Sequence, residues 1–187
     1  MYAAADLRKG LKVEIDGQPY VITEFQFNKP GKGQAIYNCR LKNLLTGATL
    51  TRSYRSNDRI DEARLASKNL RYSYPQGHHY VFMDENYEEV FIESDVLGDD
   101  GLLLTEDSAV DVLFHDDRAV SVTLPTFVEK AVAHTEPGVR GDTATNVLKP
   151  ARLAGGFEVQ VPLFVNEGDV VRIDTRTGEY VERVEKG

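Results

Sequence analysis

Apolar and polar residues alternate with a period of two along most of the chain, which is the pattern of half-buried β-strands. In the clearest segment, Leu11, Val13 and Ile15 alternate with charged residues, and a turn follows at Asp16-Gly17. Further strands of the first third are expected at Tyr20–Phe27, Ala35–Leu41 and Leu50–Tyr54. Together these segments predict a small, strongly bent sheet of roughly four or five strands.

The rest of the chain repeats this style of short strands separated by turn residues. The strands of the middle third are expected at Val81–Asp84, Glu89–Ile92, Leu102–Thr105, Val110–Phe114 and Ala119–Leu124. Those of the last third are expected at Val128–Thr135, Phe157–Val161, Val170–Asp174 and Glu179–Val184. The segment 58–70 is ambiguous, because its apolar spacing also suits a helix. Short strands at such regular intervals predict an all-β protein made of barrels or sandwiches.

Length and charge divide the chain into three parts. A chain of 187 residues has room for two or three small domains. Pro125 ends one run of strands, and the balance of charge changes near residues 63–66. We therefore expect domains at 1–64, 65–126 and 127–187. Units of this size have marginal cores, so they should stabilise one another by packing end to end.

The net charge of −8 is unevenly distributed. Residues 1–63 carry a net charge of +3, residues 64–125 carry −9 and residues 126–187 carry −2. A polyanion such as RNA needs only a local basic face, which the first third can supply. The acidic middle third is equally consistent with a surface that only keeps the protein in solution.

Composition excludes several classes of protein. No apolar run approaches the ~18 residues that cross a bilayer. The first ten residues lack the apolar segment of a secretory signal. The single cysteine, Cys39, cannot form an internal disulfide, which fits a reducing compartment. We therefore expect a cytoplasmic protein that has no membrane partner.

The segment Asn28–Gln34 is the strongest candidate for a functional loop. It is too long for a two-residue hairpin and contains no apolar anchor. Because Gly31 and Gly33 free the backbone on either side, Lys32 is expected to project at the tip of an extended arm. The spacing of a phosphate-binding P-loop is absent. A solvated loop is the alternative, but four cations on or near the same sheet favour RNA binding: Arg40, Lys42, Arg52 and Arg55.

Other reactive residues carry weaker signals. His78 and His79 are adjacent, and no third ligand lies nearby, so no metal site is expected. His115 begins a predicted hairpin turn, and Cys39 shares a strand face with apolar residues, which predicts a core position. Asp142 has no second carboxylate in a matching motif. The sequence therefore predicts no catalytic group and no cofactor.

Several motifs follow one another in the order found in a known family. The first is Lys29–Ala35, followed by Leu44–Gly47 and then by Tyr80–Asp84. The next are Glu136–Ala144 and a C-terminal signature with fixed positions at Lys149, Pro150, Ala151, Gly156, Val159, Val161, Pro162, Phe164, Val165 and Gly168. The last is Asp174–Val181. Over its whole length the chain thus resembles bacterial elongation factor P.

The resemblance implies an L-shaped protein with an SH3-like (KOW) barrel followed by two OB-fold barrels. Members of this family act as monomers on the 70S ribosome between the P and E sites, and they relieve stalling at consecutive prolines. Lys32 matches the lysine that reaches the end of the P-site tRNA at the peptidyl-transferase centre. A lysine-modifying enzyme often extends that side chain, for example by β-lysylation. Its neighbours in the tip loop are Lys29, Pro30, Gly31, Gly33 and Gln34. The loop that contacts E-site mRNA matches Gly141, Asp142 and Thr143.

The sequence argues against two other interpretations. An elongation-factor-P-like paralogue carries a longer loop, usually with arginine, and a degenerate C-terminal end, whereas this chain has a short lysine loop and an intact Arg176–Val181. A generic OB-fold RNA-binding protein or chaperone would need aromatic stacking platforms and positively charged OB domains. The charges of −9 and −2 on the two later thirds argue against it.

Overall fold

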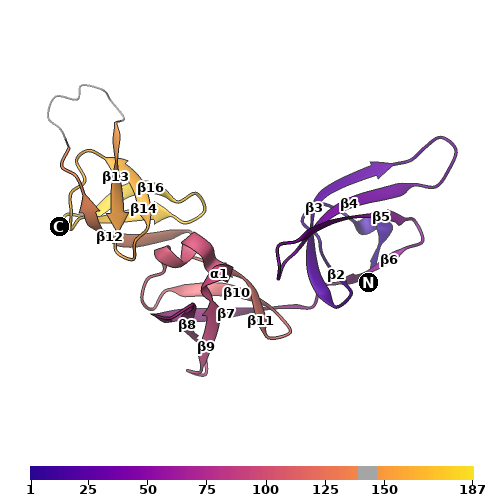
Figure 1. Ribbon diagram of the computed structural model, residues 1–187, viewed down its shortest axis with the longest axis horizontal. Helices are drawn as coiled ribbons and strands as arrows, with labels where there is room; N and C mark the ends of the chain where they lie inside the picture. The colour runs from indigo at the N-terminus through magenta and orange to yellow at the C-terminus, as the bar shows by residue number, and fades with distance from the viewer. Residues whose placement is uncertain (139–146) are drawn as a thin grey trace. The chain divides into compact units, whose positions relative to one another are not determined.

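The computed structural model describes residues 1–138 and 147–187, and it builds the chain from three β-sheets (Figure 1). The first sheet has six strands in the order β1-β6-β2-β3-β4-β5, and all of its pairings are antiparallel. Its strands are β1 (Tyr2–Ala3), β2 (Lys12–Ile15), β3 (Gln18–Asn28), β4 (Ile36–Asn43), β5 (Thr49–Arg55) and β6 (Arg59–Glu62). A short 3₁₀ helix, η1 (Ala4–Asp6), follows β1.

The second sheet has five strands in the order β11-β10-β7-β8-β9. They are β7 (Leu65–Gln76), β8 (His79–Met83), β9 (Glu89–Glu93), β10 (Ala109–His115) and β11 (Arg118–Thr123). Two short helices, α1 (Ser94–Leu97) and η2 (Gly98–Leu103), lie between β9 and β10 in the chain.

The third sheet has five strands in the order β14-β13-β12-β15-β16. They are β12 (Phe127–Thr135), β13 (Leu148–Leu153), β14 (Glu158–Pro162), β15 (Val170–Asp174) and β16 (Glu179–Glu185). The two edge strands, β14 and β16, also contact each other, so the sheet curves toward closure as a barrel. The all-β prediction is confirmed.

Alternation along the strands builds the core beneath the first sheet. The side chains of Val13 and Ile15 in β2 are buried, whereas that of Lys12 is exposed. Cys39 is buried in β4, as predicted from its strand face. The buried cluster comprises Leu7, Leu11, Val13, Ile15, Ile22, Cys39, Leu41 and Ile60.

Turn residues set the hairpins where the sequence predicted them. Asp16 and Gly17 have φ angles of 51° and 76°, which is the two-residue turn with positive φ at both central positions. Asp116 and Asp117, with φ angles of 46° and 66°, make the same kind of turn after His115. Aspartate tolerates this left-handed conformation better than most residues.

Two expectations about secondary structure need correction. The predicted strand at Leu102–Thr105 is wrong, because Gly98–Leu103 forms the helix η2. The three consecutive leucines fit any buried element. Gly101 packs so closely on the Tyr80 ring that a Cβ there would clash with the hydroxyl. The ambiguous segment 58–70 is not helical, since it forms β6 and the first part of β7.

The strand β13 was not expected from the sequence pattern. Lys149, Ala151 and Leu153 in this strand are buried, and the residues between them are exposed. A lysine and a proline broke the expected apolar pattern. The Lys149 ammonium is buried because its Nζ donates a hydrogen bond to the backbone oxygen of Glu136 at 2.6 Å.

Contacts group the described chain into two compact units. One consists of Met1–Ser67 together with Leu113–Ser121, and the other of Lys68–Val112 together with Val122–Gly187. The expected division at 1–64, 65–126 and 127–187 stays a prediction, as does the L-shaped arrangement. Among the residues that the structure describes, no helix is long and apolar enough to cross a membrane.

Candidate functional site

The Lys32 loop connects β3 to β4, whose last paired residues are Asn28 and Ile36. Residues 29–34 are all exposed, and the hairpin that carries them extends beyond the other strands of the first sheet (Figure 1). Lys32 therefore lies at the exposed tip of an arm. The same loop contains Lys29, Pro30, Gly31, Gly33 and Gln34.

The two glycines beside Lys32 differ in backbone conformation. Gly33 has a φ angle of +140°, which residues with a side chain rarely adopt, and a Cβ there would lie 3.4 Å from Cγ of Pro30. A Cβ at Gly31 would meet no other heavy atom within 4 Å. The backbone therefore requires glycine at position 33, whereas position 31 has room for a side chain.

The four cations that were predicted to bind RNA divide between two faces of the first sheet. β4 and β5 pair so that Ile36 lies opposite Arg55 and Cys39 lies opposite Arg52. Because side chains alternate along a strand, Arg52 is on the face of the buried Cys39. The other face, which we call the outer face, carries the remaining three cations: Arg40, Lys42 and Arg55.

Two guanidinium groups of this set have carboxylate neighbours. Nη1 of Arg40 lies 3.7 Å from Oε1 of Glu24, and Nη2 of Arg52 lies 3.9 Å from Oδ2 of Asp16. Exposed pairs of this kind are weak and are easily exchanged for another anion. The stretch 25–57, which carries the loop and most of β4 and β5, contains six Lys/Arg and no Asp/Glu. The arm and its base are therefore uniformly basic.

An aromatic row runs from the core of the first sheet toward the loop. Tyr37 lies opposite Phe27, and their ring centroids are 5.0 Å apart. The Phe25 ring lies 6.3 Å from the Tyr37 ring on its other side. Phe25 and Tyr37 pack against the buried cluster, whereas the Phe27 side chain is 53% exposed. The pattern of the sequence predicts the strand that carries Phe27 but not the exposure of its ring.

The predicted mRNA-contacting residues Gly141, Asp142 and Thr143 lie outside the described residues. The strand that leads toward them ends at Thr135, and β13 begins at Leu148. Before the gap, Gly138 packs so tightly that a Cβ would lie 2.7 Å from the Leu163 backbone oxygen.

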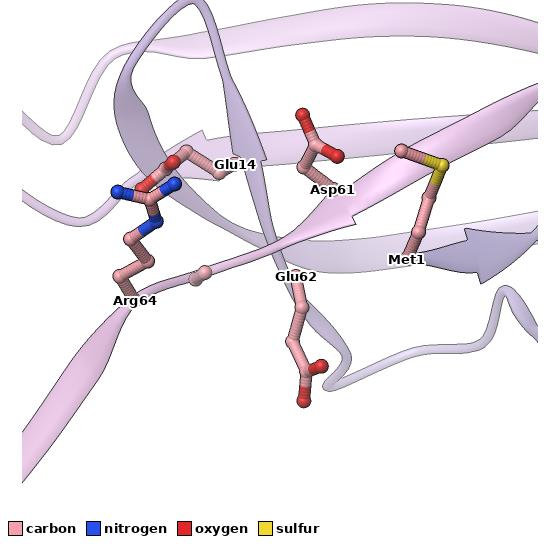
Figure 2. A pocket seen from close by; sticks show the side chains of 6 residues that line it. Met1, Glu14, Asp61, Glu62 and Arg64 are labelled. Carbon is pink, nitrogen blue, oxygen red and sulfur yellow. The ribbon is translucent and has the colours of Figure 1, made fainter.

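A polar hollow lies in the first compact unit and is lined by none of the residues of the Lys32 loop. Figure 2 shows its lining by three carboxylates and one guanidinium, from Glu14, Asp61, Glu62 and Arg64. Its volume is about 370 Å³. Within residues 1–138 and 147–187, no group of three or more His, Cys, Asp or Glu side chains could hold a metal ion. This holds for the carboxylates of the hollow as well.

The cysteine and the paired histidines show no sign of an active site. Burial raises the pKa of the Cys39 thiol, which disfavours the thiolate that a nucleophile needs. His78 lies in a turn, whereas His79 begins β8. The imidazole of His115 also makes a hydrogen bond with the carboxylate of Glu14. The sequence gave no indication of this contact, because the two residues are far apart in the chain.

Family comparisons match nearly the whole chain in three consecutive segments. Residues 3–60 match the family described as the elongation factor P (EF-P) KOW-like domain. Residues 65–122 match the elongation factor P (EF-P) OB domain, and residues 120–183 match elongation factor P, C-terminal.

Curated relatives of full length are also similar. The protein named elongation factor P from Desulfotalea psychrophila is 48% identical over 187 residues, which is all of both chains. The elongation factor P of Desulfosudis oleivorans is 51% identical, again over all of both chains. Among solved structures, eukaryotic translation initiation factor 5A from Methanococcus jannaschii aligns with a TM-score of 0.54 at 20% identity. This alignment covers 66% of the present chain and 90% of the other, and it indicates a shared fold.

Proposed function

The chain belongs to the elongation factor P family of translation factors, and on that premise we propose that it binds the ribosome beside the P-site tRNA and promotes peptide-bond formation at consecutive prolines. The observation that carries this proposal is the position of Lys32 at the exposed tip of the β3–β4 arm. A group that must enter a crowded RNA cavity needs a narrow, projecting support of this kind.

Lys32 is proposed to reach the peptidyl-transferase centre, extended by a lysine-modifying enzyme. The loop supports both steps. Its exposed side chains leave the ammonium open to an enzyme, and the glycines on either side add no bulk where RNA approaches. A long cationic side chain also suits contacts with phosphates and ribose hydroxyls.

The proposed mechanism is positioning rather than catalysis by a protein group. Proline reacts slowly in part because its secondary amine belongs to a rigid ring that is hard to align. Holding the tRNA end in a reactive geometry can lower such a barrier by several kcal/mol without any acid, base or nucleophile from the factor. The uniformly basic stretch 25–57 supplies the electrostatic attraction for such a tRNA contact.

Charge and residue type suggest the other contacts that the protein would make on the ribosome. The outer face with Arg40, Lys42 and Arg55 would neutralise RNA phosphates, and Gly141, Asp142 and Thr143 would meet E-site mRNA. The acidic middle third, at −9, would face solvent or basic ribosomal proteins.

The test is a reconstituted translation assay with a polyproline reporter. Lys32→Ala should abolish rescue of the reporter with little change in thermal stability, because an exposed loop residue alters stability by only about 0.5 kcal/mol. Lys29→Ala is the matched control, since it removes the same charge from the same loop and should only weaken rescue. Intact mass of the protein from its native host reports any extension of Lys32. Full rescue by Lys32→Ala would remove the basis of the proposal.

A further inference from the structure

We propose that Phe27 is a stacking surface for an unpaired RNA base at the foot of the Lys32 loop. This inference rests on the proposed function, and it identifies which part of the RNA meets the first sheet. A base that is already paired offers no free face, so the partner is a single-stranded segment or end.

The geometry of Phe27 suits a stacking surface. The residue lies one position before Asn28, which makes the last strand pair with Ile36 before the loop. Its ring is held by Tyr37, at a centroid distance of 5.0 Å and an interplanar angle of 52°, while about half of the side chain stays open. Tyr37 is itself fixed against the core, so Phe27 has a rigid support. An aromatic ring that is fixed in advance loses little entropy when a base stacks on it.

The surroundings favour RNA over an apolar protein partner. The stretch 25–57 carries six positive charges and no carboxylate. Phe27 lies opposite Tyr37, on the face of Cys39 and away from the outer face, so the cations that follow it directly are Lys29 and Lys32 of the loop. An apolar protein surface that covered Phe27 would bring no counter-charge to these two lysines. A single-stranded RNA satisfies both features, because its phosphates neutralise the loop lysines while its bases offer π-faces to the ring.

Phe91 provides a contrast within the same chain. Its side chain is 51% exposed, which is close to the value for Phe27. It lies in β9, where alternation places Glu89 and Glu93 on the same face of the strand. Those carboxylates repel the phosphates of RNA, so we expect no RNA base to stack on the exposed ring of Phe91. Phe91 is therefore the matched control position.

The first experiment uses the absence of tryptophan from the chain. Phe27→Trp introduces a single fluorophore into the full-length protein, and Phe91→Trp places one at the control position. The probes are a short single-stranded oligoadenylate, an RNA hairpin of equal charge and inorganic polyphosphate. We expect saturable quenching of the Phe27→Trp protein by oligoadenylate, weaker quenching by the hairpin, and none by polyphosphate. The Phe91→Trp protein should not respond.

Affinity and translation supply the second readout. Phe27→Ala should weaken oligoadenylate binding by about tenfold, as expected for the loss of one stacked base, and Phe27→Tyr should restore it. The same pair is compared in the polyproline assay, with thermal unfolding as the check on folding. Phe27→Ala should reduce rescue, and Phe27→Tyr should retain it.

The outcomes separate this inference from the proposed function. If the wild-type protein does not accelerate the polyproline reporter, the proposed function fails. If the wild type is active but Phe27→Ala equals it in both assays, the stacking surface is refuted. Equal quenching by polyphosphate and oligoadenylate also overturns the inference, because it would reveal attraction by charge without stacking. Quenching of both tryptophan variants by oligoadenylate would have the same consequence.

Discussion

Nε2 of His115 lies 2.8 Å from Oε1 of Glu14, although 101 residues separate the two in the chain. Both side chains are largely shielded from water, with exposures of 4% for the imidazole and 16% for the carboxylate. Nδ1 of His115 also lies 3.8 Å from Oδ2 of Asp116. The contact joins β2 to the end of β10 within the first compact unit. It therefore links β2 and β10, which belong to different sheets and are not paired with each other.

The contact makes the stability of this unit depend on pH. The hydrogen bond with His115 holds the pKa of Glu14 below its ordinary value, with help from the backbone N–H and charge of Arg64. A carboxylate with a lowered pKa in the folded state stabilises the protein above its unfolded pKa, and this stabilisation is lost as the pH falls through the lowered value. Glu14→Gln should therefore destabilise the protein on the order of 1–2 kcal/mol at neutral pH and by less in acid.

Urea unfolding of the wild type and of Glu14→Gln, at neutral pH and below pH ~4, checks this prediction. Glu24→Gln is the control, because the Glu24 carboxylate is exposed and pairs only loosely with Arg40. It should change stability little at either pH. A deficit of Glu14→Gln that persists undiminished in acid would contradict the assignment.

The two glycines of the tip loop should respond differently to substitution. Gly33→Ala must strain a backbone with φ near +140°, whereas Gly31→Ala enters open space. We expect Gly33→Ala to misdirect Lys32 and to reduce polyproline rescue several-fold, at a backbone cost of about 1 kcal/mol or more. Gly31→Ala should retain most activity, and bulkier Gly31→Val should lose more. Equal activity of the two alanine variants would show that loop conformation does not matter.

The faces of the first sheet should differ in their salt dependence of ribosome binding. Each phosphate contact that is lost lowers the slope of log K against log salt by about 1. Lys42→Gln or Arg55→Gln, on the outer face, should each reduce the slope by about that amount. Arg52→Gln should leave the slope unchanged, because Arg52 lies on the opposite face near Asp16. Titrations over a range of salt concentrations measure the slopes, and a change with Arg52→Gln alone would reverse the assignment of faces.

The segment that contains Asp142 should act independently of the Lys32 arm. Asp142→Ala is expected to shorten residence on stalled ribosomes, with a loss of ~1–3 kcal/mol for one polar contact. It should leave the modification of Lys32 unchanged, since the two residues lie more than one hundred positions apart. Ribosome-binding kinetics and the mass of the Lys32 peptide are measured on the same sample. Loss of the modification would mean that the enzyme also depends on this segment.

Local patterns predicted those features that local chemistry decides. Alternation placed Val13 and Cys39 in the core, and the Asp16-Gly17 pair fixed a turn whose φ angles are both positive. The failures occurred where a tertiary contact overrides the pattern. Lys149 is buried because its ammonium donates a hydrogen bond to the Glu136 backbone oxygen, and no periodicity in the sequence could reveal that partner.

The candidate site shows the same division. The exposed lysine loop follows from its glycines and its lack of apolar anchors. Arg52 and Arg40 lie on opposite faces of the sheet because of the register between β4 and β5. The residue pattern of one strand does not reveal how it is aligned with its neighbour. The exposure of Phe27 arises because the arm extends past the core that covers Phe25, and this too is visible only once the strands are paired.

The absence of acidic residues from the stretch 25–57 has a consequence for cells whose interior becomes acidic. This stretch also lacks histidine, so no group in it has an ordinary pKa between about 4 and 8. Mild acid therefore meets no carboxylate and no imidazole in this stretch through which to change its charge. The contact proposed between the arm and RNA phosphates should therefore depend little on pH in this range.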